Sequence, residues 1–486
     1  MSRIKSQLSW EFASAILLVG IALLAYNFTT PLATGRPESP GLGSSEFLRG
    51  DSNDDGNLDI ADPLHILLYL FGDGEVPACL AAADTDDNST VQIGDAISLL
   101  NYLFRGGPPP ALPFPAVDVD PTPDLFCRGP ELPPLPPVGS LGGPDRELTA
   151  EEALSWRRGL LLFDSIATVE GGLGPLFNGD SCRGCHHDPV VGGAGGLDVD
   201  VVRFGYVDGQ GLVSELPTGP VASRLSVGDT PRDELHVDAN LVETRQTPTL
   251  FGLGLVDRIR DEVLLGYVDP NDVNGDGITG RARMVDGRPG RFGHKADVPT
   301  LIDFTADALF NELGLTVNPA HSIFAGAVDG DAAPDPELSD QDFADLAFFI
   351  SHLAPPSPVL PINPTAVQRI EEGESFFLSI GCGGCHVPTL VSADGVVNAY
   401  SDFLLHDVGD PARYHVKDHG VESGEFRTPP LWGLRDTAPY LHDGSAETIR
   451  DAILNGHYGE ASAARQGFES LTFDSRSKVE EFLLSR

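Results

Sequence analysis

Two copies of the motif Cys-x-x-Cys-His, at residues 182–186 and 382–386, constrain this chain most strongly. Two thiols at this spacing reach both vinyl groups of one haem, and the adjacent histidine then ligates the iron. A lone CxxC is more typical of a zinc site or a redox dithiol, but zinc needs two further ligands nearby and none accompanies either motif. The motifs therefore predict two covalently bound haem c groups, held by Cys182, Cys185, His186, Cys382, Cys385 and His386.

The ligand on the opposite side of each iron decides what such a chain does. A haem with two strong ligands carries electrons, whereas one with an open side binds a small molecule such as peroxide. Only two methionines exist, Met1 and Met284, so histidines such as His294, His442 and His457 are the main pool of second ligands. For any one of them, the ordinary alternative is a hydrogen-bonded structural histidine.

An internal repeat with an offset of 33 residues (84 − 51) precedes the haem motifs. Each copy is an acidic loop with oxygen-bearing residues at the spacing of a calcium-binding EF-hand-type loop. An acidic surface loop would explain one copy, but repetition predicts two calcium sites. Their expected ligands are Asp51, Asn53, Asp55, Asn57, Asp59 and Asp62 in copy one, and Asp84, Asp86, Asn88, Thr90, Gln92 and Asp95 in copy two.

An apolar helix is expected to follow each calcium loop. In the first copy the helical spacing of the apolar residues predicts a buried face. That face would contain Ile60, Leu64, Leu67, Leu68 and Phe71.

The N-terminal residues and the charge restrict where the chain works and what it binds. Arg3 and Lys5 precede an apolar run over residues 12–26, which predicts a signal peptide and hence a periplasmic or otherwise exported protein, with an uncleaved membrane anchor as the alternative. In an oxidising compartment the two remaining cysteines, Cys79 and Cys127, are expected to form a disulfide. A net charge of −41 without a basic run argues against nucleic acid and is compatible with a basic electron-transfer partner.

The chain is expected to be mainly α, with two cytochrome c-like haem domains and long loops behind a small α calcium-loop module. A similar segment follows each haem motif, Arg245–Gln246–Thr247–Pro248 after the first and Arg427–Thr428–Pro429 after the second, so the haem domains are predicted to face each other as duplicates. The predicted parts are residues 1–35 (signal or anchor), 44–105 (calcium module), 106–147 (Pro-rich linker), 148–355 (first haem domain) and 356–486 (second haem domain).

Two stretches resemble known families. Residues 47–104 resemble a type I dockerin, a calcium module that docks onto a protein partner, although here it is expected to be only dockerin-like. From about residue 148 onward the chain resembles the di-haem oxidoreductase family, often described as thiol oxidoreductases, which is related to di-haem cytochrome c peroxidases. The resemblance rests on residues 172–179, 245–253, 276–281, 291–293 and 437–444, besides the haem motifs.

The family resemblance implies roles for individual residues. Glu312 matches the peroxidase glutamate that moves protons beside the peroxide-binding haem, although a surface carboxylate is the alternative. His457 falls where the peroxidases place a second axial ligand, and His294 falls where relatives carry a tryptophan between the haems. The carbonyls of Thr437 and Pro439, with Gln246, match a calcium site between the domains.

The expected activity is therefore peroxide reduction, with electrons relayed between two haems from a donor or acceptor protein. Oxidation of a small thiol or sulfur compound is an alternative substrate class that no residue identifies. An electron carrier with two bis-histidine haems is an alternative without catalysis. A scaffold built on the calcium module is a further alternative, which the dense motifs around both haems disfavour.

Overall fold

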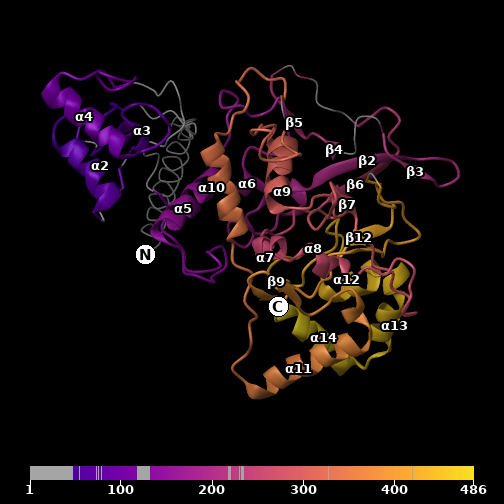
Figure 1. Ribbon diagram of the computed structural model, residues 1–486. Coiled ribbons are helices and arrows are strands. Elements are labelled where there is room, and N and C mark those ends of the chain that lie inside the picture. Colours follow the sequence, from indigo (N-terminus) through magenta and orange to yellow (C-terminus); the bar gives the residue numbers. More distant parts are fainter. Residues whose placement is uncertain are drawn as a thin grey trace, which may run out of the picture. The chain divides into compact units, whose positions relative to one another are not determined.

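The computed structural model describes residues 47–117 and 132–486, except residues 54, 73, 75, 78, 217–220, 229, 231–234, 327 and 419 (Figure 1). The predicted signal or anchor and Cys127 lie outside the described residues. Cys79 is disulfide-bonded, as predicted for an oxidising compartment. Among the described residues, no helix is both long enough and apolar enough to cross a membrane.

Helices and short strands alternate along the chain. The module contains α2 (Ala61–Phe71), α3 (Leu80–Ala83) and α4 (Ile93–Arg105). The helices after residue 148 are α5 (Ala150–Asp164), α6 (Cys182–Cys185), α7 (Leu253–Asp257), α8 (Asp261–Leu265), α9 (Leu301–Ala308), α10 (Asp340–Ser351), α11 (Pro364–Ser379), α12 (Ile449–Gly456), α13 (Ser462–Ser470) and α14 (Phe473–Leu484), with short turns at Leu197–Val199, Leu309–Leu313, Cys382–Gly384 and Gly459–Ala461.

Small antiparallel sheets complete the fold. The largest has the strand order β3 (Val213–Ser214), β2 (Val201–Val207), β4 (Val221–Ala222), with β6 (Leu241–Arg245) also paired to β2. The two-stranded sheets join β1 (Leu176–Phe177) to β5 (Leu225–Ser226), β7 (Met284–Val285) to β8 (Arg288–Pro289), β9 (Leu390–Ser392) to β10 (Gly395–Val397), and β11 (Leu405–Asp407) to β12 (Glu425–Arg427). The expectation of a mainly α chain is therefore met only in part, because helices and small sheets are mixed.

Two helix pairs, α5 with α10 and α11 with α14, are built in the same way. Each of the four helices begins at a side-chain cap, supplied by Thr149, Ser339, Asn363 and Thr472. Each pair crosses where one helix has a glycine. A Cβ on Gly159 would lie 2.1 Å from the backbone oxygen of Asp345, and one on Gly373 would lie 2.0 Å from that of Lys478. Only glycine allows the backbones to approach so closely.

Aromatic residues one turn after each glycine connect the helix pairs to the haem motifs. The ring centroid of Phe163 lies 6.2 Å from that of His186, and the ring centroid of Phe377 lies 6.0 Å from that of His386. Phe163 also contacts Phe349 of α10, and Phe377 contacts Phe482 of α14. The two motifs thus rest on equivalent scaffolds, as expected for a duplicated domain.

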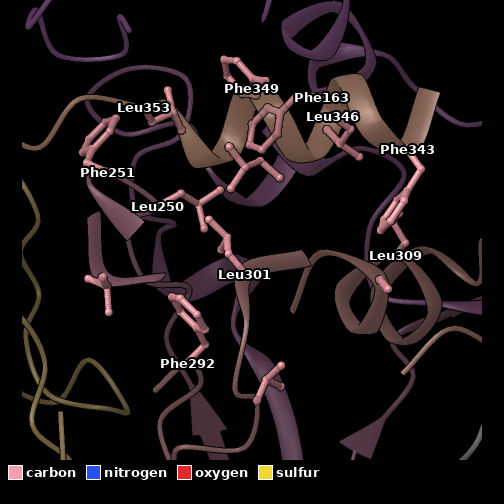
Figure 2. Packing of buried hydrophobic residues seen from close by; sticks show 14 of the residues in the cluster. Phe163, Leu250, Phe251, Phe292, Leu301, Leu309, Phe343, Leu346, Phe349 and Leu353 are labelled. Carbon is pink, nitrogen blue, oxygen red and sulfur yellow. The ribbon is translucent and has the colours of Figure 1, made fainter. Parts of the chain in front are cut away.

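The larger hydrophobic core surrounds the first helix pair. Figure 2 shows Phe163 packed beneath Leu346 and Phe349 of α10, with Leu250 and Leu301 on the side away from α10. Trp156 and Phe349 are fully buried, with ring centroids 4.9 Å apart. A smaller core around Phe377, Phe468, Val479 and Phe482 supports the second pair.

One prediction about the N-terminal module is wrong, because most of the apolar face expected to be buried on α2 is exposed. Ile60, Leu64, Leu68 and Phe71 are 50–71% exposed instead of buried. Asp62, at the start of α2, turns its carboxylate back to accept hydrogen bonds from the backbone N–H groups of Ser52 and Asp59. This contact sets the rotation of α2, so that Asp62 and Ile66 face inward, Leu67 packs against the small core, and the other four residues of the predicted face point outward.

We predict that Gly373→Ala lowers the unfolding free energy of the second helix pair by about 1–3 kcal/mol, because the added methyl group must displace a backbone carbonyl. The matched control is Gly209→Ala, where no heavy atom lies within 4 Å of the new Cβ. The control should change stability by less than about 0.5 kcal/mol. Urea denaturation followed by circular dichroism measures both, and equal midpoints would contradict the packing argument.

Candidate functional site

The second CxxCH motif faces a second histidine. Nδ1 of His386 lies 2.9 Å from the carbonyl oxygen of Tyr400, and Nδ1 of His457 lies 2.9 Å from that of Ala452. An Nδ1–H donated to a carbonyl fixes the neutral tautomer and leaves Nε2 to ligate a metal. The two ring centroids are 6.4 Å apart.

This spacing fits one metal ion between the two rings. Two nitrogen–metal bonds of about 2 Å each, extended by the half-widths of the rings, span about 6 Å. Burial lowers the pKa of His386 to about 4 and also lowers the pKa of His457. Both rings are therefore neutral at physiological pH, which is the form that ligates metal.

A cavity of about 370 Å³ lies at this pair of histidines. Its wall includes Cys382 and Cys385 from the second motif, and Phe377 of α11. It also reaches the segment 246–249, which follows the first motif in the sequence. The residues around the second motif therefore fit a large planar cofactor that is held by two thiols and two axial nitrogens.

The first motif has a different environment. His186 caps the end of α6, and its Nδ1 lies 3.2 Å from the carbonyl oxygen of Gly193. Burial lowers the pKa of His186 to about 4, as it does for His386. In the described part of the chain, the aromatic ring in contact with His186 is Phe163, and no second histidine ring lies at contact distance. The residues thus offer one axial nitrogen at the first motif and two at the second.

Glu312 lies beside the first motif. It sits on the π-helical turn Leu309–Leu313 that continues α9, and such turns are frequent at functional sites. Its Oε2 accepts a hydrogen bond of 2.8 Å from Asn178 Nδ2, and its carbonyl accepts one of 2.7 Å from Asn178 N. Burial raises the pKa of Glu312, against the hydrogen bond from Asn178 and the charges of Arg203 and Arg224. The charge of Glu312 in turn raises the pKa of Cys185, second only to burial.

The redox-dithiol and zinc alternatives find no support at either motif. Burial raises the pKa of Cys182 and Cys382 to about 12, which is opposite to the shift that a reactive dithiol needs. Among the described residues, the clusters of side chains that could hold a metal ion contain none of the motif cysteines.

His294 lies between the segment that begins at Arg245 and the segment that begins at Arg427. Its Nε2 lies 3.1 Å from the carbonyl oxygen of Gln246, and its own carbonyl accepts a hydrogen bond from Arg427 N. It lines the same cavity as His386 and His457, but its ring is not among their ring contacts. This position is compatible with a residue between two haems, whereas a ligand role gains no support because the ring of His294 is not paired with that of either motif histidine.

Sequence reasoning missed two buried charged groups near the second motif. His406 lies 2.9 Å from Asp402 and 3.0 Å from Glu460, and hydrogen bonds to these carboxylates raise its pKa to about 12 against burial. Glu243 on β6 contacts both His415 and His442. The separations along the chain are 54 residues or more for the contacts with Glu460, His415 and His442, so no local motif signals them.

The second predicted calcium loop brings three of its predicted ligands together. Asp84, Asp86 and Asp95 place carboxylate oxygens within 4.8 Å of one another. Burial raises the pKa of Asp84 to about 7 and that of Asp62, in the other loop, to about 6. Asp51 and Asp84 accept equivalent backbone hydrogen bonds, from Gly56 and Ser89 respectively. Crowded, buried carboxylates of this kind suit a bound cation.

A comparison with protein families matches the C-terminal part of the chain. A family model described as "Di-haem oxidoreductase, putative peroxidase" matches residues 222–486, more than half of the chain. The match includes the second motif, Glu312, His294 and His457. No curated protein matches the sequence.

Two solved structures are similar to the chain at low identity. A hydrazine synthase from Kuenenia stuttgartiensis has 16% identity and a TM-score of 0.35, with 74% of this chain and 99% of that chain covered. A MauG-like protein associated with microbial copper homeostasis has 17% identity and a TM-score of 0.36, with 74% and 95% covered. These scores support no inference about function.

The family model carries the assignment. Its match covers residues 222–486, which is more than half of the chain and contains the second CxxCH motif. The chain therefore belongs to the di-haem oxidoreductase family and is a haem-dependent, peroxidase-like oxidoreductase.

Proposed function

We propose that this chain is an exported di-haem c-type cytochrome that reduces peroxide at the first haem with electrons delivered through the second. The observation that carries the proposal is the difference between the two motifs. The ring of His386 faces that of His457, whereas His186 has no second histidine ring at contact distance among the described residues and lies near Glu312. Bound haem would supply the redox chemistry, with covalent attachment through Cys182 and Cys185 at one site and Cys382 and Cys385 at the other.

The second site is suited to carrying electrons. If His386 and His457 both held the bound haem, the site would carry electrons and would not bind a small substrate. His294 lies in the wall of the same cavity and bonds to the segment that follows the first motif. We assign it to the path between the two sites, not to the iron.

The first site is suited to proton transfer. Reduction of peroxide to two waters consumes two electrons and two protons, and one proton must reach the oxygen that leaves. A carboxyl group whose pKa is raised by burial holds a proton more readily than an exposed one and can pass it to a neighbouring oxygen. Asn178 orients the carboxyl group of Glu312 through the 2.8 Å hydrogen bond. A thiol or sulfur substrate remains an alternative without a residue to support it.

The N-terminal module is proposed to bind two calcium ions and to dock onto a protein. Equivalent apolar residues of the two repeats are exposed by half or more of their surface. They are Ile60 and Ile93, Leu64 and Ile97, and Phe71 and Phe104. The disulfide at Cys79 supports an exported location, which the apolar segment at residues 12–26 also suggests.

We expect His457→Ala to convert the second haem from six-coordinate low-spin to high-spin, because one axial nitrogen is lost. Electron paramagnetic resonance of the oxidised protein measures this change. The control is His321→Ala, whose ring contacts Asp340 and Phe343 and does not line the cavity. A second haem that stays low-spin in His457→Ala would rule out His457 as its ligand.

Glu312→Gln should lower kcat for peroxide reduction about 10²–10⁴-fold while leaving both haem spectra unchanged, because the amide keeps the shape and cannot transfer the proton. Steady-state turnover with an artificial electron donor measures the effect. Glu262→Gln, at a carboxylate 73% exposed, is the matched control. Equal turnover in the two variants would refute the proton-transfer role.

In a calorimetric titration of the full-length chain, stripped with a chelator, the two loops of the module should bind one calcium ion each. Calcium at about 100 times its Kd should then stabilise the module by about 2.7 kcal/mol. Asp84→Ala should lower the number of bound ions by one, since the first loop keeps its own ligands and serves as an internal control. A chain that binds no calcium, or the same number of ions after the substitution, contradicts the assignment.

A further inference from the structure

Glu243 holds two histidines with one carboxylate oxygen. Nδ1 of His415 and Nε2 of His442 each lie 2.7 Å from Oε1 of Glu243. The other oxygen, Oε2, accepts a hydrogen bond of 3.0 Å from Val416 N and lies 2.6 Å from Nη1 of Arg245. Side chains alternate between the two faces of a strand, so Glu243 and Arg245 on β6 both point to its buried face.

This arrangement leaves one basic nitrogen on each ring. When a neutral imidazole donates one N–H to Glu243, its other nitrogen is an acceptor. His415 is 4% exposed, and its Nε2 is buried without a hydrogen-bond partner in the described part of the chain. The unoccupied nitrogen is therefore able to accept a proton, and the ionised Glu243 would stabilise the resulting imidazolium.

The triad connects two cavities. His415 and His442 both line the cavity that contains His386 and His457. His415 also lines a second cavity of about 260 Å³, together with Asp407 and Asp410. His415 therefore lies in the wall of both cavities, where a proton from the second cavity can reach its ring.

Several charged groups surround the triad. The titratable and charged groups that face the triad are Arg245, Lys295, His294, Arg413, Asp443 and Asp407. Burial and the charge of Arg245 lower the pKa of His442, while the histidines lower the pKa of Glu243. A negative charge added nearby in a medium of low dielectric constant favours protonation of a neighbouring base.

We propose that the His415–Glu243–His442 triad takes up one proton from solvent when the second haem gains one electron. The proposal rests on the haem ligation proposed above. One electron comes from the donor protein, one proton comes from solvent, and one N–H bond forms on an imidazole nitrogen. Glu243 stays ionised throughout, so the net charge of the cavity is unchanged and the proton is stored next to the cavity that the electron enters.

The test is the pH dependence of the midpoint potential of the second haem in the holoprotein. Spectroelectrochemical titration from about pH 5 to about pH 9 should show a potential that falls as pH rises, because a rise in pH removes the proton that stabilises the reduced state. One proton per electron corresponds to a tenfold change per pH unit, which is about 59 mV. Glu243→Gln and His415→Gln should flatten this slope, whereas the control His321→Gln should keep it.

Electron paramagnetic resonance separates failure of the ligation from failure of the inference. A low-spin signal from the second haem in Glu243→Gln shows that His386 and His457 still bind and that the variant is folded. A pH-independent potential in the wild type, with that signal present, overturns only the proton uptake. A slope that survives in both triad variants and disappears in Lys295→Met also overturns it, because the buried lysine would then be the acceptor.

Discussion

Two helix crossings with no room for a methyl group place both haem motifs. A Cβ at Gly159 or Gly373 would fall 2.1 Å or 2.0 Å from a carbonyl oxygen of the partner helix. One helical turn later, Phe163 and Phe377 pack between the partner helix and the histidine of the motif. The position of each proximal histidine thus depends on a backbone-to-backbone contact that any larger side chain would open. Everything that distinguishes the two sites is added around this shared scaffold.

The difference between the sites comes from segments outside the scaffold. In the sequence, α12 lies between α11 and α14, and His457 at its end faces His386. Near the first motif it instead provides the π-helical turn with Glu312 and its partner Asn178. A duplicated scaffold can therefore carry two different sets of surrounding residues without any change in the CxxCH motif. Membership of the di-haem oxidoreductase family is consistent with this difference between the two sites and does not depend on it.

Buried charge is concentrated around the second motif. His406 is held between Asp402 and Glu460, and Glu243 is held between His415, His442 and Arg245. Removing charges from water is costly unless each has a partner. Lys295 meets the same requirement differently, by donating to three backbone carbonyls while its Nζ lies 3.8 Å from the centroid of Phe426. Such networks make the electrostatics of the cavity depend on a few specific contacts.

The sequence alone was sufficient to predict the features that depend on residues close together in the chain. The two CxxCH motifs and the repeated acidic loops, each followed by a helix, could be predicted, because their chemistry or packing pattern is set within about a dozen positions. The rotation of α2 could not, since it depends on how the Asp62 carboxylate folds back onto the preceding loop. Glu312 and His457 were reachable from family resemblance, but not which motif each would face. Only the tertiary structure decided that Glu312 lies by the first motif, that His457 faces the second, and that Glu243 meets histidines 172 and 199 residues away. These contacts form between segments whose separation in sequence carries no periodic signal, and only the packing of the folded chain brings them within bonding distance.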